Sequence, residues 1–244
     1  MKFKTLLKKL PIFSGIAQKL NNLNSRIDFV AHQLSLIPDG CKVLDAGCGS
    51  QQFKIYANHL QYFGQDFGGY HSDDKPVLGS DPGGLGGAAG YDYGKIDYLG
   101  DIWEIDEEDN TFDCILCTEV FEHIPYPIET VKEFSRLLKP GGTLILTSPS
   151  NCLRHMDPYF YYTGFTDRWF EVILKEHDFD LIQCEPVGDY FSWLAVEMAR
   201  SGMFGGYLAK LLLAPAFLYF YCKKKTQLSV DTLCMGYHVV AKKK

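Results

Sequence analysis

Apolar positions along the chain follow two spacings that alternate from beginning to end. The stretches 51–59, 127–138 and 166–177 show the three-to-four-residue spacing of amphipathic helices. Short apolar and β-branched runs, typical of strands, occur at 42–46, 61–66, 96–102, 112–118, 143–149, 177–184 and 233–241. Strands that alternate with helices predict an α/β fold with a doubly wound, mostly parallel seven-stranded sheet.

Two stretches interrupt this alternation, and a helical segment precedes it. Residues 1–40 predict amphipathic helices that either pack on the sheet or form a lid or a membrane contact. Residues 188–230 form a helical insertion where a simple hairpin would suffice. We therefore expect a ligand-binding domain made of 41–187 and 231–244, with these two segments added to it.

The second interruption is the stretch 68–95, which holds nine glycines. So many glycines prevent the usual crossover helix. A long connection without secondary structure in a compact domain is usually functional or disordered. This stretch therefore predicts either a wall or lid of the ligand pocket, or a mobile surface loop.

The insertion contains helical runs at 190–197 and 207–221, the second of them strongly apolar. The apolar run is shorter than the roughly 20 residues of a spanning helix and contains Lys210 and Pro215. We expect it to pack on the core or to form a homodimer contact. A peripheral membrane contact through 203–225 is the alternative, since Lys223 to Lys225 would suit headgroup level.

Composition limits the partners and the compartment. With 244 residues, 46% of them hydrophobic, and a formal net charge of −6, the chain can bury a core but is no general nucleic-acid binder. Its eight cysteines have no disulfide-framework spacing, which indicates a reducing cytosol. No cleavable signal sequence is visible, so we expect a cytoplasmic protein or one peripheral to the inner face of the membrane.

The turn after the first strand carries the first sign of a ligand site. Asp45 precedes Gly47-Cys48-Gly49, and the glycines allow a ligand to lie against the backbone. Two further acidic residues follow the next two strands. Asp66, at the tip of the second strand, suits a ribose diol, and Asp101-Ile102 suits adenine.

Taken in order, these motifs resemble those of class I S-adenosylmethionine (SAM) methyltransferases. The resemblance covers 40–150 and includes Phe112-Asp113 through Glu122-His123 and Leu138 to Gly142. It is similar in particular to small-molecule methyltransferases associated with bacterial surface-glycan biosynthesis. The resemblance implies a Rossmann-like fold with an antiparallel last strand and SAM as cofactor. The implied cofactor-binding residues are Asp45, Gly47, Cys48, Gly49, Asp66, Phe67, Asp101, Ile102, Thr118 and Glu119.

Two sets of residues are candidates for the chemistry itself. His155 follows the fifth strand and would serve as the base for a hydroxyl acceptor, unless it is a surface-loop histidine. Glu119, Glu122 and His123 resemble the metal-binding run of RNA-end and quinone-precursor O-methyltransferases, with His155 as a further ligand. The carboxylates would share one helix face. Since these residues can equally brace the helix, we assign no metal and keep them as candidates.

The sequence thus predicts a SAM-dependent methyltransferase that acts on a small-molecule acceptor, with a hydroxyl of a sugar or a lipid-linked glycan as the acceptor group we expect. The alternative is a catalytically inactive SAM-fold binding or scaffold protein at a membrane surface.

Overall fold

The computed structural model describes residues 22–69, 93–156 and 158–244. It divides into two compact units. The sheet unit comprises Ile27–Glu185 and Tyr237–Lys244, and the helical unit comprises, in its described part, Asn22–Arg26 and Pro186–Gly236. Residues 1–21 of the predicted N-terminal segment and residues 70–92 of the glycine-rich stretch lie outside the described residues.

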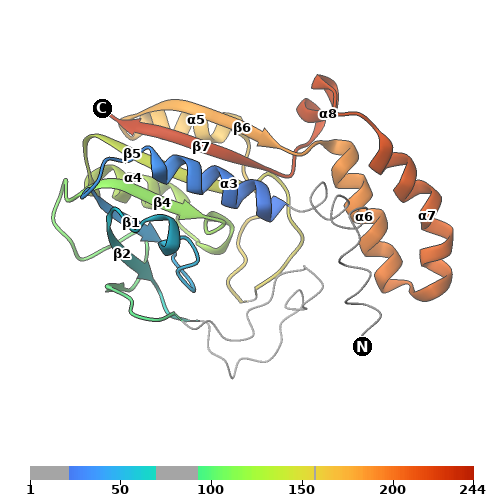
Figure 1. The fold of residues 1–244 in the computed structure, drawn as a ribbon, viewed down its shortest axis with the longest axis horizontal. Coiled ribbons are helices and arrows are strands. Elements are labelled where there is room, and N and C mark those ends of the chain that lie inside the picture. Colours follow the sequence, from blue (N-terminus) through green and yellow to red (C-terminus); the bar gives the residue numbers. More distant parts are fainter. Residues whose placement is uncertain (1–21, 70–92, 157) are drawn as a thin grey trace. The chain divides into compact units, whose positions relative to one another are not determined.

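Seven strands form one sheet in the order β3-β2-β1-β4-β5-β7-β6 (Figure 1). Pairing is parallel from β3 through β2, β1 and β4 to β5, and β7 runs opposite to β6. This confirms the predicted α/β class. The strands are β1 (Lys42–Ala46), β2 (Gln61–Asp66), β3 (Tyr98–Leu99), β4 (Phe112–Thr118), β5 (Leu138–Pro149), β6 (Phe179–Val187) and β7 (Gly236–Lys243).

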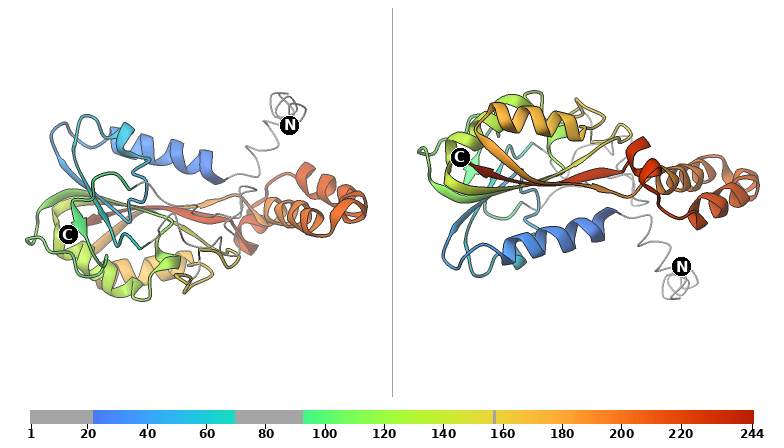
Figure 2. Two further views of the ribbon diagram at one scale, coloured as in Figure 1. Left: turned by 90° about the horizontal axis from the view of Figure 1, so that it is seen from below. Right: turned by 90° about the horizontal axis from the view of Figure 1, so that it is seen from above.

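Helices cover both faces of the sheet (Figure 2). On one face, α3 (Asn22–Ser35) packs Val30 and Leu34 against a cluster that includes Val43 and Phe53. On the other face lie α4 (Pro127–Leu137) and α5 (Asp167–Glu176). As predicted, the side chain of Thr166 caps α5 by accepting a hydrogen bond from the N–H of Trp169.

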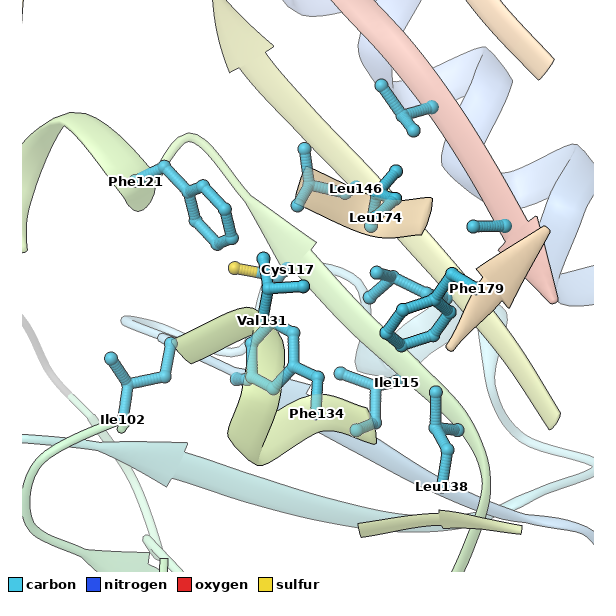
Figure 3. Packing of buried hydrophobic residues seen from close by; sticks show 14 of the residues in the cluster. Ile102, Ile115, Cys117, Phe121, Val131, Phe134, Leu138, Leu146, Leu174 and Phe179 are labelled. Carbon is cyan, nitrogen blue, oxygen red and sulfur yellow. The ribbon is translucent and has the colours of Figure 1, made fainter. Parts of the chain in front are cut away.

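The larger core cluster fills the space between the sheet and these two helices (Figure 3). Phe134 of α4, Leu174 of α5 and Phe179 at the start of β6 are each at most 1% exposed. Truncating such a side chain costs about 3 to 5 kcal/mol for a phenylalanine. Ile102 belongs to the same cluster, which fixes the loop after β3 against the core.

The predicted helix at 51–59 is wrong. The described chain there contains only the 3-10 turn η1 (Lys54–Tyr56). Gln51 adopts a left-handed φ of 56°, which breaks the helical path, and the Asn58 amide donates to the carbonyl of Ile55 and so competes with helix continuation. The connection from β1 to β2 is therefore mostly turn, and it keeps the glycine turn close to β2.

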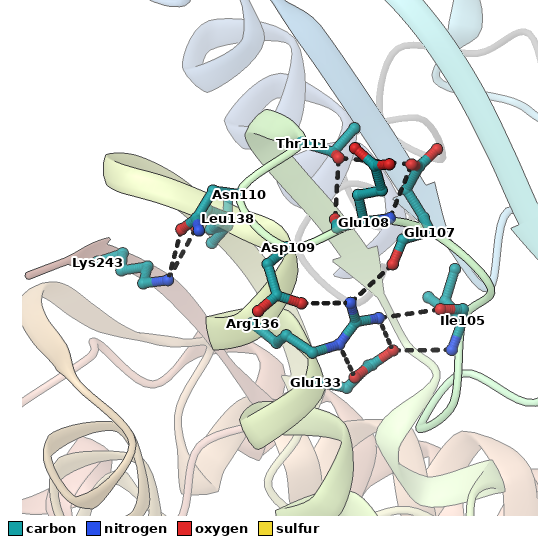
Figure 4. Close-up of polar contacts among 10 residues, drawn as sticks. All are labelled: Ile105, Glu107, Glu108, Asp109, Asn110, Thr111, Glu133, Arg136, Leu138 and Lys243. Carbon is teal, nitrogen blue, oxygen red and sulfur yellow. Dashed lines mark hydrogen bonds and ion pairs between the residues drawn. The ribbon is translucent and has the colours of Figure 1, made fainter.

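The loop between β3 and β4 is held by one arginine on α4 (Figure 4). Arg136 donates to the carbonyls of Glu107 (2.7 Å) and Ile105 (2.9 Å) and to both carboxylate oxygens of Glu133. Glu133 in turn accepts from the N–H of Ile105 at 2.8 Å. These bonds fix the loop that begins with Asp101 and Ile102 without using either of those residues.

The helical unit contains α6 (Tyr190–Phe204), α7 (Gly206–Cys222) and α8 (Gln227–Thr232). Asp189, 3% exposed, caps α6 by accepting from Ser192 and also accepts from the hydroxyl of Ser229 at 2.7 Å. This one carboxylate thereby links α6 to α8. Among the described helices, none is both long enough and apolar enough to cross a membrane.

Candidate functional site

A cavity of about 280 Å³ opens at the edge of the sheet where β1, β2 and β4 end. Seven of the ten predicted cofactor residues line it: Gly47, Gly49, Asp66, Phe67, Asp101, Ile102 and Glu119. The parallel register explains this convergence, because β1 pairs with both β2 and β4 and their carboxyl ends reach one edge.

The glycine turn has a conformation that other residues would strain. Gly47 has a φ of +73°, and a Cβ added there would lie 2.5 Å from Cγ2 of Val120. The N–H groups of Gly47 and Cys48 both donate to the carbonyl of Gln65 at 2.9 Å. The turn is thus tied to β2 and presents a bare backbone to the cavity.

Asp66 joins two parts of the cavity wall. Its Oδ2 accepts from the N–H of Gly49 at 2.9 Å, and its Oδ1 accepts from the N–H of Gly68 at 3.0 Å. The side chain is only 6% exposed, and this burial raises the pKa of its carboxyl, although the backbone N–H groups act in the opposite direction. Each oxygen keeps acceptor capacity that could receive a ribose hydroxyl.

Three predicted cofactor residues lie outside the cavity lining. Asp45 is 1% exposed, and its Oδ2 accepts from the Tyr62 hydroxyl at 2.5 Å. Burial raises the pKa of the Asp45 carboxyl to about 7. Cys48 is buried, and Thr118 ends β4 opposite Thr147. Of the three, Asp45 ties the end of β1 to β2 through its bond with Tyr62.

The sequence-based prediction missed an aromatic part of the wall. Trp103, Tyr159 and Tyr161 line the cavity, and Phe67 meets Tyr159 edge to face with ring centroids 4.8 Å apart. The N–H of Tyr161 donates to the carbonyl of Glu122 at 2.9 Å, which holds the segment after β5 against the segment after β4. Tyr159 and Tyr161 come from a segment without apolar periodicity, so no strand or helix pattern indicated them.

The predicted helix face that would carry both Glu119 and Glu122 is not formed. Glu119 has a left-handed φ of 53° and precedes the 3-10 turn η2 (Phe121–His123). Its Oε1 accepts from the Thr147 hydroxyl at 2.9 Å. The Glu119 side chain is therefore bonded to Thr147 of β5, while Glu122 lies in η2 and is 2% exposed.

Glu122, His123 and His155 nevertheless come together, with one potential ligand atom of each within 4.8 Å of the others. His123 lines the cavity, and its Nδ1 lies 2.6 Å from the carbonyl of Tyr159. The Nδ1 of His155 lies 2.8 Å from the carbonyl of Leu153. Because a carbonyl can only accept, each Nδ1 is the donor, and Nε2 is the ring atom of each histidine that is left to face a ligand.

Burial lowers the pKa of His123 to about 4, more than its bond to the Tyr159 carbonyl raises it. Its imidazole is therefore neutral near pH 7 and suited to ligate a cation. His155 packs edge to face on His123, with ring centroids 4.7 Å apart, and is not among the residues that line the cavity. The predicted base thus contacts His123 but is not part of the cavity lining.

Comparison with known proteins agrees with this site. The sequence profile described as "Methyltransferase domain" matches residues 18–183, more than half of the chain. The chain belongs to this methyltransferase family. Its glycine turn, Asp66 and the Asp101–Ile102 pair fall within the matched part and line the cavity, which fits SAM as the family's cofactor.

Among curated relatives, the ubiquinone biosynthesis O-methyltransferase of Xanthomonas oryzae pv. oryzae (strain PXO99A) is 30% identical over 148 residues. The match covers 60% of this chain and 59% of that protein, so it spans a little over half of the relative's length.

Two solved structures share the fold. One is described as a sarcosine dimethylglycine methyltransferase from Galdieria sulphuraria, with a TM-score of 0.53, 16% identity, and coverage of 90% of this chain and 84% of the other. The other is the [4+2]-cyclase SpnF, with a TM-score of 0.52, 20% identity, and coverage of 90% and 80%. A cyclase with this fold means that the fold alone does not establish methyl transfer.

Proposed function

We propose that this chain transfers a methyl group from SAM to a hydroxyl of a small-molecule acceptor. The observation that carries the proposal is the cavity itself, where the bare glycine turn, the Asp66 carboxylate and Ile102 meet at one sheet edge beside His123. SAM supplies an activated methyl on a sulfonium, so the chain's contribution is alignment and exclusion of water.

In this proposal each part of the cavity lining binds a different part of SAM. The Gly47–Gly49 backbone receives the amino-acid end of SAM, Asp66 accepts from the ribose hydroxyls, and Asp101 with Ile102 holds adenine. Asp45 contributes by supporting the turn rather than by direct contact, since its carboxyl is bonded to Tyr62.

For the acceptor we favour a planar phenolic hydroxyl over a sugar hydroxyl. Trp103, Tyr159 and Tyr161 are aromatic residues of the cavity lining, which suits a flat aromatic acceptor. The relatives named ubiquinone biosynthesis O-methyltransferase support the same class of acceptor. A phenol also loses its proton more readily than a sugar hydroxyl, so a weaker base suffices.

Deprotonation of the hydroxyl can proceed in two ways, which differ in whether the histidine Nε2 takes the proton or binds a cation. In the first, Nε2 of His123, which lines the cavity, takes the proton as a general base, with the His155 ring packed against it. In the second, Glu122, His123 and His155 hold a divalent cation, which would polarise the hydroxyl and lower its pKa. Two imidazoles and a carboxylate are a donor set that zinc, manganese and iron accept.

Chelation separates the two. If the cation is required, EDTA abolishes turnover, and calorimetric titration with Mn²⁺ or Zn²⁺ shows one site that His155→Ala removes. Turnover that is indifferent to EDTA, together with no cation binding, leaves the histidines as bases.

The proposal itself is tested by transfer from methyl-labelled SAM to two acceptor sets, catechol-type phenols and sugars or lipid-linked glycans. Label in the phenols supports the favoured acceptor, and label in the glycans alone replaces it with the sugar hydroxyl. SAM binding without any transfer would instead favour the second function class, a binding or scaffold protein of the same fold.

A further inference from the structure

The helix α7 presents an apolar face to solvent. On an α-helix, positions 207, 208, 211, 212, 215, 218, 219 and 222 share one side. The six large side chains among them are 54% to 84% exposed: Tyr207, Leu208, Leu211, Leu212, Leu218 and Tyr219. The described structure contains no buried residue anywhere in α7. A surface helix of a globular protein normally turns a polar side outward, whereas the outward side of α7 is apolar.

The other side of α7 is occupied by α6. The two helices are joined through Gly205 and form a hairpin (Figure 1). A Cβ added to Gly202 of α6 would lie 3.4 Å from the Cα of Lys210, which shows how closely the backbones approach. The hairpin thus has its own interior, and its outer face is left for another partner.

Charge around this face has one sign. From Met198 to Val230 the chain contains no Asp or Glu, although its net charge is −6. Lys210 lies beside the start of the face, and Lys223 to Lys225 follow its end, with Lys223 over the ring of Tyr219 at 4.6 Å. The surface therefore combines exposed leucines, a tyrosine near each end, and flanking lysines.

We propose that this face of α7 docks on an anionic phospholipid bilayer. Leucines would enter the acyl boundary, the tyrosines would lie at headgroup level, and the lysines would meet the lipid phosphates. A second copy of the chain fits less well, because a two-fold contact would bring this segment against itself, with lysines and no acidic partner. The 17 residues of α7 span about 26 Å and include Lys210 near one end, so the helix lies along the surface rather than across it.

Flotation of the full chain with vesicles tests the proposal. We expect the chain to float with vesicles of phosphatidylcholine mixed with phosphatidylglycerol, and much less with phosphatidylcholine alone. Replacing Lys224 and Lys225 by glutamine should weaken binding about 30-fold, since one lysine near an anionic surface contributes about fivefold. The matched control replaces Lys132 and Lys175, two exposed lysines of the sheet unit, and should leave binding unchanged.

A second pair of variants tests the apolar part. Leu211→Ser with Leu212→Ser should lower binding at least about tenfold, whereas Ile55→Ser, at a residue 65% exposed on the sheet unit, should not. Equal binding to neutral vesicles, or equal loss in the controls, overturns the proposal. So does a homodimer in sedimentation velocity that these serines dissociate while vesicles leave the chain unbound. SAM titration of the same variants reports on the cofactor site separately, so the two proposals can fail independently.

Discussion

Replacing Asp45 by asparagine should change how stability depends on pH. Asp45 is 1% exposed at the end of β1 and accepts from the Tyr62 hydroxyl at 2.5 Å. Burial raises the pKa of its carboxyl from the ordinary 3.8 to about 7, the Tyr62 bond lowers it, and the charge of Asp66 adds to the increase. The protein therefore favours the protonated form, and asparagine imitates that form at every pH.

The magnitude follows from proton linkage. Between pH 4 and 7 the folded chain holds a proton at Asp45 that the unfolded chain has released, so the free energy of unfolding falls as pH rises. The decrease is about 1.4 kcal/mol per pH unit, or about 4 kcal/mol over the roughly three units of the pKa increase. Below pH 4 both states are protonated, and above pH 7 the cost no longer grows.

Urea denaturation of both proteins at pH values from 4 to 8 measures this effect. The free energy of unfolding of Asp45→Asn minus that of the parent should increase by up to about 4 kcal/mol between pH 4 and 7 and then level off. A difference that stays constant over this range would refute the buried, protonated carboxyl.

Asp113 provides a control of opposite sign. Burial opposes its ionisation, but the Lys139 ammonium at 2.6 Å and the N–H of Lys42 at 2.9 Å outweigh burial and hold the pKa of this carboxyl below its ordinary value. Its stabilisation is present above the pKa of the unfolded chain and is lost as pH falls. The free energy of unfolding of Asp113→Asn minus that of the parent should therefore fall as pH rises through the pKa of the unfolded chain, the opposite of the trend for Asp45→Asn.

Two further predictions concern the cavity. In thermal unfolding, Gly47→Ala should destabilise the chain by about 1 to 3 kcal/mol more than Gly141→Ala. Both glycines have a positive φ, but only a Cβ at Gly47 would meet Val120. Equal losses of stability would contradict the close contact between Gly47 and Val120. Asp66→Ala should weaken SAM binding about 100-fold in calorimetric titration, because two charge-assisted hydrogen bonds are lost, whereas His155→Ala should change it less than about threefold. Equal effects from the two would contradict the roles proposed for them.

The parts of the site that the sequence revealed are those set by local chain geometry. Gly47, Gly49 and Asp66 stand at fixed places relative to strand ends, so the strand pattern was enough to bring them to one cavity. The partner of Asp45 was not visible in this way. It depends on the register of β1 with β2, which places Tyr62 opposite Val43 and within reach of the carboxyl.

The rest of the site depends on backbone conformations and loops that lack a repeating pattern. Glu119 leaves the expected helix because its φ is positive, and Tyr159 and Tyr161 reach the cavity through a loop held by the carbonyl groups that they contact. The contact between His123 and His155 joins segments after β4 and β5 that only the folded sheet brings together. Such contacts carry no periodic signal in the sequence.

Calorimetric titration of the full chain with SAM, alongside Asp66→Ala, tests most directly whether this cavity binds the cofactor. We expect one site with a dissociation constant between about 1 μM and 1 mM, as is usual for enzyme ligands, and a loss of about 100-fold in the variant. No binding by the parent chain at about 1 mM SAM would contradict the assignment of this cavity to the cofactor.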